Sequence, residues 1–486
     1  MGQIHRRRFL QGAAGAAAAV ALGGPFQGFT VLAAGKGRDR QNTLRAVPDL
    51  RDGIVRLHLP EGFAYRSFHD TETPVDLDDG TRLPGRHDGM GAFALANGNV
   101  MLVRNHEVNN PGPAFGPGTP YDPMAQAGTT STEVTLQGQV VNSYTSLNGT
   151  AMNCSGGIMP WGSWITCEET VNGPDVGADF TGVSNVPLTQ RHGFIFEVPA
   201  DGQSDRQPIT AAGRFPHEAV AFDPKGGILY LTEDNFAFPS GFYRYVPASN
   251  PMDSGRLGND GQLQMLRVDG SSNAHLEANG TAGTQYAVDW VDIGDPNPTF
   301  AFTPGLPAPT PNDTALTFVG DQGRANGAAG FSRLEGAVYD RGVVYFTSTQ
   351  GGGDAETGPQ LTAGYGRGFG QVWGYHVDEG ILELVFQSPG PTTLDFPDNV
   401  TTSARGTLIL NEDSSGDNFL RGLTRKGELF DVALNRFVSQ ITGNPRFSDE
   451  FAGSTFSPGG ETLFVNIQAS RGISYAIWGP WGRLGV

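Results

Sequence analysis

The sequence predicts an all-β fold, a six-bladed β-propeller with long loop excursions, and three observations support this prediction. First, the 486 residues include 70 Gly and 33 Pro, a composition that favours turns and short strands over long helices. Second, apolar and polar residues alternate over short segments, whereas the 3.6-residue period of a helix is absent over any long window. Third, one pattern recurs six times along the chain.

Residues 1–34 are the predicted export signal. Arg6, Arg7 and Arg8 precede Phe9-Leu10 and an Ala/Gly-rich run that ends at Ala34. The Arg-Arg-x-Phe-Leu pattern is typical of twin-arginine signals, so we expect the twin-arginine export machinery as a partner and a periplasmic or extracellular location. No later segment has the roughly 20 continuous apolar residues of a membrane span, and we therefore expect no stable membrane insertion.

The formal net charge of the chain is −18 at pH 7. Because residues 1–34 contain three arginines and no acid, taking their three positive charges from −18 leaves −21 for residues 35–486. This balance argues against nucleic acid as a recognised partner. We expect residues 35–486 to form a single propeller domain with an irregular insertion at about 251–330, a Pro-, Gly- and Asn-rich stretch with few core residues.

The recurring unit has a small-residue strand, a Gly-containing turn, an apolar strand and a closing polar cluster. Three or four antiparallel strands in each unit match a propeller blade, and a β-sandwich is the structural alternative. The copies begin at His87, Cys154, His217, Leu334, Asp398 and Glu450 and close at Arg104–Glu107, Cys167–Glu169, Thr232–Asn235, Thr347–Gln350, Asn411–Asp413 and Asn466–Gln468.

Acidic residues occupy two recurring positions of this unit. The opening position includes Asp88, Glu218, Glu335, Asp398 and Glu450, and the closing position adds Glu107, Cys167, Glu168, Glu233, Asp234, Glu412 and Asp413. In a propeller the innermost strands line one channel, so these carboxylates would converge and would either take up protons or bind cations. A single acid at a strand end is more often a turn cap than a ligand, and the prediction therefore depends on the repetition.

Carboxylate and Asn oxygens suit hard ions such as calcium, whereas a thiolate favours a transition metal. The chain has only two cysteines, Cys154 and Cys167. In an oxidising compartment they could pair as a disulfide, and Cys167 could then not be a thiolate ligand. The two interpretations exclude each other.

Arg333 lies two residues before Glu335. A guanidinium beside a carboxylate cluster can clamp a phosphoryl group through two parallel hydrogen bonds and offset its developing charge. Its alternative role is an ion pair with a neighbouring acid. His217, next to Glu218, is interpreted as a hydrogen-bonded structural histidine rather than a ligand.

Four motifs resemble those of the PhoX phosphatases in order and spacing, namely Trp161–Glu169, Gly213–Glu218, Phe331–Gly336 and Asp398-Asn399. The resemblance implies a six-bladed propeller, twin-arginine export and a cluster of Fe³⁺ and Ca²⁺ ions. By this resemblance Cys167, Glu218 and Glu335 would hold the iron pair and Arg333 would contact the substrate phosphate. Asp398, Glu168, Glu107 and Glu412 would be calcium ligands.

The sequence therefore predicts an exported, metal-dependent phosphatase that hydrolyses small-molecule phosphomonoesters. Two alternatives stay open. One is a metal-dependent phosphodiesterase or lactonase on the same scaffold, and the other is a non-catalytic, calcium-stabilised propeller that binds a partner.

Overall fold

The computed structural model describes residues 43–486, so the predicted signal at 1–34 lies outside the described residues. Within this range the strands form five hydrogen-bonded sheets. One sheet contains β4 (His87–Ala94), β5 (Val100–His106), β6 (Ala127–Val134) and β7 (Val140–Thr150). A second sheet contains β8 (Asn153–Met159), β9 (Ser163–Glu168) and β10 (Ile195–Pro199). The largest runs from β11 (His217–Asp223) through β12 (Ile228–Glu233), β13 (Phe242–Val246), β14 (Gln262–Val268) and β15 (Gln285–Asp292) to β19 (Ile381–Gln387), β18 (Gln371–His376), β17 (Val343–Ser348) and β16 (Leu334–Asp340).

The other two sheets combine strands from both ends of the described chain. One contains β20 (Pro397–Thr402), β21 (Leu408–Glu412), β22 (Phe419–Leu423) and β23 (Leu429–Asn435), followed by β2 (Val55–Leu59) and β1 (Arg45–Pro48). The other contains β24 (Phe451–Phe456), β25 (Thr462–Ile467), β26 (Ile473–Trp478) and β3 (Ala64–Phe68). The helical elements are short apart from α2: η1 (Thr210–Ala212), α1 (Pro251–Ser254), α2 (Asn312–Ala325) and α3 (Trp481–Leu484).

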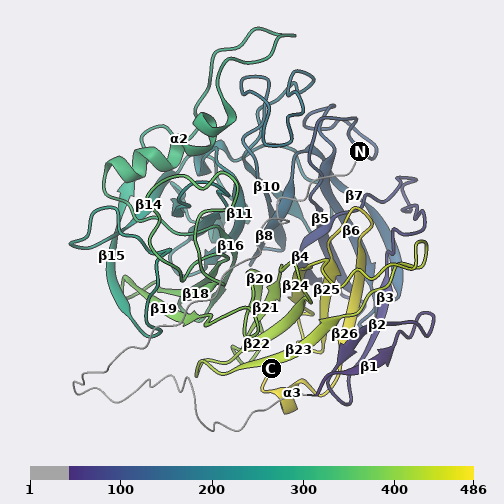
Figure 1. Ribbon diagram of the computed structural model, residues 1–486. Coiled ribbons are helices and arrows are strands. Elements are labelled where there is room, and N and C mark those ends of the chain that lie inside the picture. The colour runs from purple at the N-terminus through teal and green to yellow at the C-terminus, as the bar shows by residue number, and fades with distance from the viewer. Residues whose placement is uncertain (1–42) are drawn as a thin grey trace, which may run out of the picture.

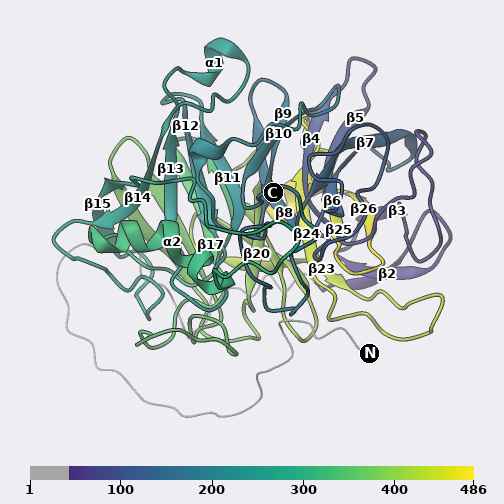
Figure 2. The ribbon, with the colours of Figure 1, turned by 90° about the horizontal axis from the view of Figure 1, so that it is seen from above.

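The sheets are arranged around a common centre. Their innermost strands contact one another in a closed cycle, β4 to β8, β8 to β11, β11 to β16, β16 to β20, β20 to β24 and β24 back to β4. Figure 1 shows these strands around the middle of the molecule, and Figure 2 shows α1 projecting from the connection between β13 and β14. The described chain is mostly β and propeller-like, which confirms the predicted fold class at this coarser level.

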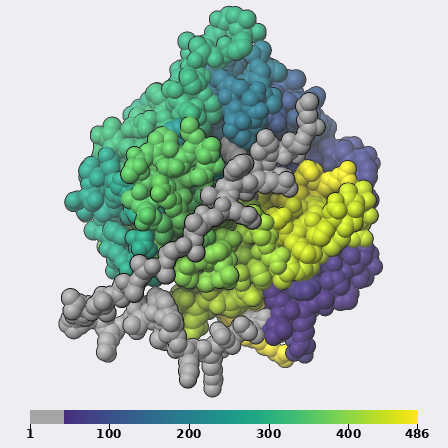
Figure 3. Space-filling model, in the orientation of Figure 1, coloured from purple at the N-terminus to yellow at the C-terminus, as the bar shows by residue number. Residues whose placement is uncertain are grey.

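The first and last parts of the described chain pair with each other in two of the sheets. Strand β3 pairs with β26, where Ser67 lies opposite Tyr475, and β2 pairs with β23. In Figure 3 the purple segment accordingly lies against the yellow one. Strands from the first part of the described chain thus cover β26 and β23, the strands that would otherwise be the outer edges of these two sheets.

The segment 251–330 differs from the expected irregular insertion with few core residues. It contains β14, β15 and α2, and β15 joins β14 to β19. Leu263, Met265 and Val319 from this segment are buried in the core. Apolar and polar residues alternate in Gln262–Val268 as in a half-buried strand. The pattern is hard to recognise in the sequence because Gly- and Pro-rich stretches surround it.

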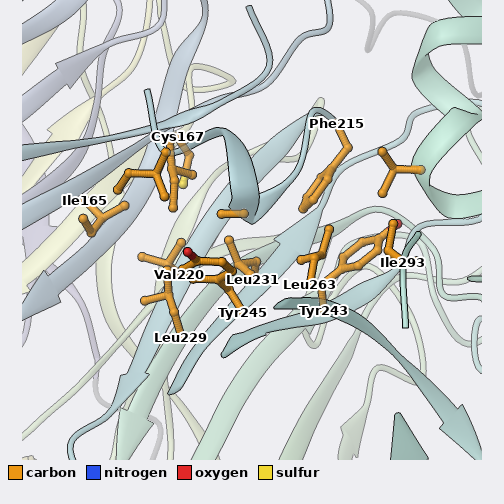
Figure 4. Packing of buried hydrophobic residues seen from close by; sticks show 14 of the residues in the cluster. Ile165, Cys167, Phe215, Val220, Leu229, Leu231, Tyr243, Tyr245, Leu263 and Ile293 are labelled. Atoms are coloured by element: carbon orange, nitrogen blue, oxygen red, sulfur yellow. The ribbon is translucent and has the colours of Figure 1, made fainter. Parts of the chain in front are cut away.

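Apolar side chains pack between neighbouring sheets rather than in one central core. Between β9 and the β11–β14 sheet the cluster includes Ile165, Val220, Leu231 and Phe215, all buried (Figure 4). Because the apolar side chains pack between the sheets, polar residues can occupy the centre around which the sheets are arranged. None of the helices in residues 43–486 is long and apolar enough to cross a membrane.

Candidate metal centre

The innermost strands share one irregularity near their first residue. In β11 His217 pairs with Glu233, but the next regular pair is Val220 with Leu231, so Glu218 and Ala219 are skipped. A bulge of this kind interrupts the alternation of side chains and re-aims them. The same shift skips Asp88-Gly89 in β4, Cys154-Ser155 in β8, Glu335-Gly336 in β16 and Asp398-Asn399 in β20.

A backbone hydrogen bond recurs beside each bulge. The residue that follows the second strand donates its N–H to the carbonyl of the residue that precedes the inner strand. The pairs, with their N···O distances, are Glu107 to Arg86 (3.0 Å), Glu169 to Met152 (3.0 Å), Asp234 to Pro216 (3.1 Å), Thr349 to Arg333 (3.0 Å), Asp413 to Phe396 (3.0 Å) and Gln468 to Glu450 (3.1 Å). The bond fixes the closing acids next to the opening ones.

Three groups of potential ligand atoms result, and within each the atoms lie within 4.8 Å of one another. The groups are Cys154, Glu169 and Glu218, then Glu218, Glu335 and Asp398, then Asp398, Asp413 and Glu450. Because Glu218 and Asp398 each belong to two groups, the three form one continuous acidic cluster. Glu218 is 3% exposed and Glu335 is 2% exposed.

Burial and mutual repulsion raise the pKa of these acids. The pKa of Glu218 lies well above its usual value because the carboxyl is desolvated and faces Glu335 and Asp398. The pKa of Glu335 is raised in the same way by burial and by Asp234 and Asp398. Burial and Glu107 likewise raise the pKa of Asp88. Carboxyls in this position bind either protons or cations.

The predicted ligands Glu218, Glu335 and Asp398 are thus brought together. Glu168 and Glu412 lie on the other face of their strands. Glu168 Oε1 lies 2.6 Å from His192 Nδ1, and its other oxygen accepts from the backbone of Gly193. Glu412 accepts from Arg421 Nε at 2.9 Å and from the backbone N–H of Phe419. These two carboxylates already have several hydrogen-bond donors.

Glu107 and Cys167 are placed differently. Glu107 accepts hydrogen bonds from the Arg86 guanidinium at its carbonyl and its carboxylate. Cys167 is fully buried among the apolar side chains between β9 and β11 (Figure 4). Both cysteines are free thiols, and the Cys154 thiol donates to the carbonyl of His217 at 3.2 Å. Burial raises the pKa of both thiols.

Sequence reasoning missed Cys154 and Glu169 as candidate ligands, and it named Asp413 as an acid of the closing position without selecting it as a ligand. Cys154 lies on β8, which pairs with the strand that contains the predicted ligand Cys167, and Glu169 and Asp413 directly follow the predicted ligands Glu168 and Glu412. Adjacent residues of a strand face opposite sides. The available signal was the repeat itself, since Cys154 occupies the opening position and Glu169 and Asp413 directly follow the second strands.

Arg333 lies beside the cluster and is 5% exposed. Its Nε and Nη2 atoms donate to the two carboxylate oxygens of Asp234 at 3.1 and 2.6 Å, and Nη2 also donates to Glu335 at 2.7 Å. The residue adopts a φ of 40°, in the left-handed region. The predicted arginine is therefore next to the acids, as expected.

His217 is buried, and its Nε2 atom lies 3.0 Å from the carbonyl oxygen of Gly213. Its ring stacks on Phe215 with a centroid separation of 3.7 Å. Desolvation lowers the pKa of His217 to about 3. A neutral, stacked imidazole agrees with the structural role expected from the sequence.

The fold and the site together define a propeller-like protein with a buried acidic centre. The chain belongs to the alkaline phosphatase PhoX family, whose family model matches residues 43–140 and 118–470, and it is a phosphomonoesterase of that family. A twin-arginine translocation signal matches residues 3–23, which indicates export from the cytoplasm. No curated protein matches the chain.

A solved structure shares the fold, and other solved structures give weaker matches. The chain is similar to Pseudomonas fluorescens PhoX in complex with vanadate, a transition state analogue, with a TM-score of 0.63 and 17% identity over 91% of this chain and 98% of that chain. Virginiamycin B lyase from Staphylococcus aureus gives a TM-score of 0.37 with 13% identity over 86% and 99% of the two chains. A gluconolactonase from Xanthomonas campestris gives 0.41 with 11% identity over 89% and 97%.

Proposed function

We propose that the acidic cluster holds Fe³⁺ and Ca²⁺ ions and that the protein hydrolyses small-molecule phosphomonoesters there. The observation that carries the proposal is the sharing of Glu218 and Asp398 between neighbouring groups of ligand atoms. Shared carboxylates of this kind suit cations that lie close together, and positive ions would relieve the repulsion that raises the carboxyl pKa values.

The donor atoms support a division of the cluster by metal type. Cys154, Glu169 and Glu218 offer one sulfur and carboxylate oxygens, a set that suits iron. Asp398, Asp413 and Glu450 offer only oxygen, which suits calcium. Of the residues chosen from sequence we keep Glu218, Glu335, Asp398 and Glu107, and we propose Cys154, Glu169 and Asp413 in place of Cys167, Glu168 and Glu412.

Bound metal ions would polarise a phosphoryl oxygen and lower the pKa of a nucleophilic water. Arg333 would offset the charge that develops on the transferred group. Its contacts with Asp234 and Glu335 hold the guanidinium beside the cluster. The low exposure of Arg333 strengthens such an interaction, since little water competes with it.

Arg86 is a second candidate for the phosphate. It occupies the same position of its copy as Arg333, because its carbonyl accepts the recurring backbone bond and its φ of 49° is also left-handed. Glu107, Glu450 and Asp88 raise the pKa of Arg86. We therefore assign it to the opposite side of the same anion site.

We also propose that the sheets count as six blades in one domain. Support comes from the closed cycle of inner strands and from the backbone bond that recurs beside each of them. In this count the nine-stranded sheet supplies two blades, which share the added strand β15.

The test combines metal analysis with activity. Protein purified without added ions is expected to contain iron and calcium and to hydrolyse p-nitrophenyl phosphate, whereas Arg333→Ala is expected to lose roughly 100-fold in kcat/KM. Bis-p-nitrophenyl phosphate and a lactone serve as comparison substrates. A stable protein that contains calcium without iron and hydrolyses none of these substrates would instead support the non-catalytic, calcium-stabilised propeller that binds a partner.

A further inference from the structure

The guanidinium of Arg333 is held by a second set of residues that carries no charge. The ring of Phe236 lies beside it, with 5.5 Å from the Arg333 Cζ atom to the ring centroid. A cation over an aromatic face is attracted by the ring's negative face, and the attraction grows when water is excluded. Phe236 belongs to the short connection between β12 and β13, directly after Asp234 and Asn235.

The backbone of one residue in the neighbouring loop, Tyr365, joins both sides of this arrangement. The backbone N–H of Tyr365 donates to the carbonyl of Phe236 at 2.7 Å. The carbonyl of Tyr365 accepts from the hydroxyl of Ser332, which directly precedes Arg333. Tyr365 thus ties the residue that stacks on Arg333 to the residue that precedes Arg333 in the chain.

Two glycines make this connection possible. Gly364 and Gly366 have φ values of 83° and 117°, which disfavour side chains. A Cβ atom on Gly366 would overlap the hydroxyl of Ser332 and the carbonyl of Gln350. Gly358 lies in the same loop but has nothing within 4 Å of such an atom and no left-handed φ.

We infer that Phe236 and the Gly364–Gly366 peptide are positioning elements that set the guanidinium of Arg333 for the phosphoryl group. The inference rests on the proposed contact between Arg333 and that group. Asp234 and Glu335 provide the charge partners, and the ring with its tethered loop fixes where the guanidinium lies. A displacement of about 1 Å at such a group is costly for catalysis.

The first experiment uses the full, metal-loaded protein. Phe236→Leu is expected to weaken inhibition by inorganic phosphate and to lower kcat/KM for p-nitrophenyl phosphate by about tenfold. Phe236→Tyr is expected to retain both values, because the ring remains. Trp290→Leu is the matched control, since Arg244 lies 4.7 Å from the centroid of that ring on outer strands.

Gly366→Ala, like Phe236→Leu, is expected to weaken inhibition by phosphate and to lower kcat/KM. Gly358→Ala is expected to leave activity unchanged. Metal content and thermal midpoint are measured for every variant. In an Arg333→Ala background Phe236→Leu is expected to add nothing further, because it acts through Arg333.

The outcomes separate the two claims. If Arg333→Ala binds phosphate as the wild type does, the proposed role of Arg333 fails. If Arg333→Ala loses phosphate affinity while Phe236→Leu and Gly366→Ala behave as the wild type, the positioning role alone is overturned. Additive losses in the double variant would also overturn it, since they show that Phe236 acts elsewhere.

Discussion

Glu168 and Glu169 are adjacent in sequence but their carboxylates contact different groups. Glu168 accepts from His192 and from the backbone of Gly193 and Phe194, whereas a carboxylate oxygen of Glu169 lies within 4.8 Å of ligand atoms of Cys154 and Glu218. Adjacent residues at the end of a strand face opposite sides of the sheet. One acid therefore stabilises its own blade and its neighbour joins the shared cluster.

The two glutamates are expected to fail in different ways when each becomes glutamine. Glu168→Gln weakens a buried pair with His192, so we expect a loss of about 3–5 kcal/mol in the free energy of unfolding. Glu169→Gln is expected to lower metal content and activity at near-normal stability. Chemical denaturation and metal analysis on both proteins check this, and metal loss in Glu168→Gln without loss of stability would reverse the assignment.

The cysteines give a parallel prediction. Cys154→Ser is expected to reduce the iron content, because the Sγ atom of Cys154 belongs to the acidic cluster. Cys167→Ser places a hydroxyl among apolar side chains and is expected to cost about 1–3 kcal/mol of stability while iron stays bound. Iron analysis together with thermal unfolding distinguishes them. Equal iron loss in both variants would contradict the prediction.

Gly453 lies where two inner strands approach closely. Its φ is 62°, and a Cβ atom there would overlap the carbonyl oxygen of Asp88. Gly453→Ala is therefore expected to cost more than about 3 kcal/mol of unfolding free energy, combining backbone strain with overlap. Gly443 has a φ of 70° but nothing within 4 Å, so Gly443→Ala is expected to cost only about 1 kcal/mol. Equal costs in denaturant titrations would contradict this view of the contact.

Chelation is expected to destabilise the protein more as the pH rises. Without cations the folded state holds the carboxyl pKa values of Asp88, Glu218 and Glu335 above their ordinary values. The folded protein then binds more protons than the unfolded chain, so stability falls as the pH rises from the ordinary carboxyl pKa toward the raised values. Bound cations remove this dependence.

The measurement is the thermal midpoint at pH 6, 7.5 and 9 with and without a chelator. His192 also makes the stability fall with rising pH, and it does so in both series. The pKa of His192 is raised to about 9, so its contribution to stability is complete below pH 6.5 and is lost as the pH rises through about 9. The difference between the series isolates the cluster. A chelator effect that shrinks with rising pH would argue against cation binding by these acids.

Much of the fold and part of the site could be predicted because they depend on local pattern. The repeat predicted the strand pairs that begin near His87, His217 and Leu334, and its opening position predicted that Asp88, Glu218, Glu335 and Asp398 lie close to other acids. The segment 251–330 was misread because β14 and β15 lie between Gly- and Pro-rich stretches that conceal their alternation. The choice between Glu168 and Glu169, or between Glu412 and Asp413, depends on which face each strand presents to its neighbour.

The sequence by itself determined the class of fold, the export signal and the gathering of acids at recurring positions, since alternation and repetition are properties of the chain. Only the tertiary structure decided which side chains share one centre. The bulges that skip Cys154-Ser155 and Glu218-Ala219 re-aim the side chains. The neighbours of each face then decide whether a carboxylate meets hydrogen-bond donors or other acids, and that depends on segments far away in the chain.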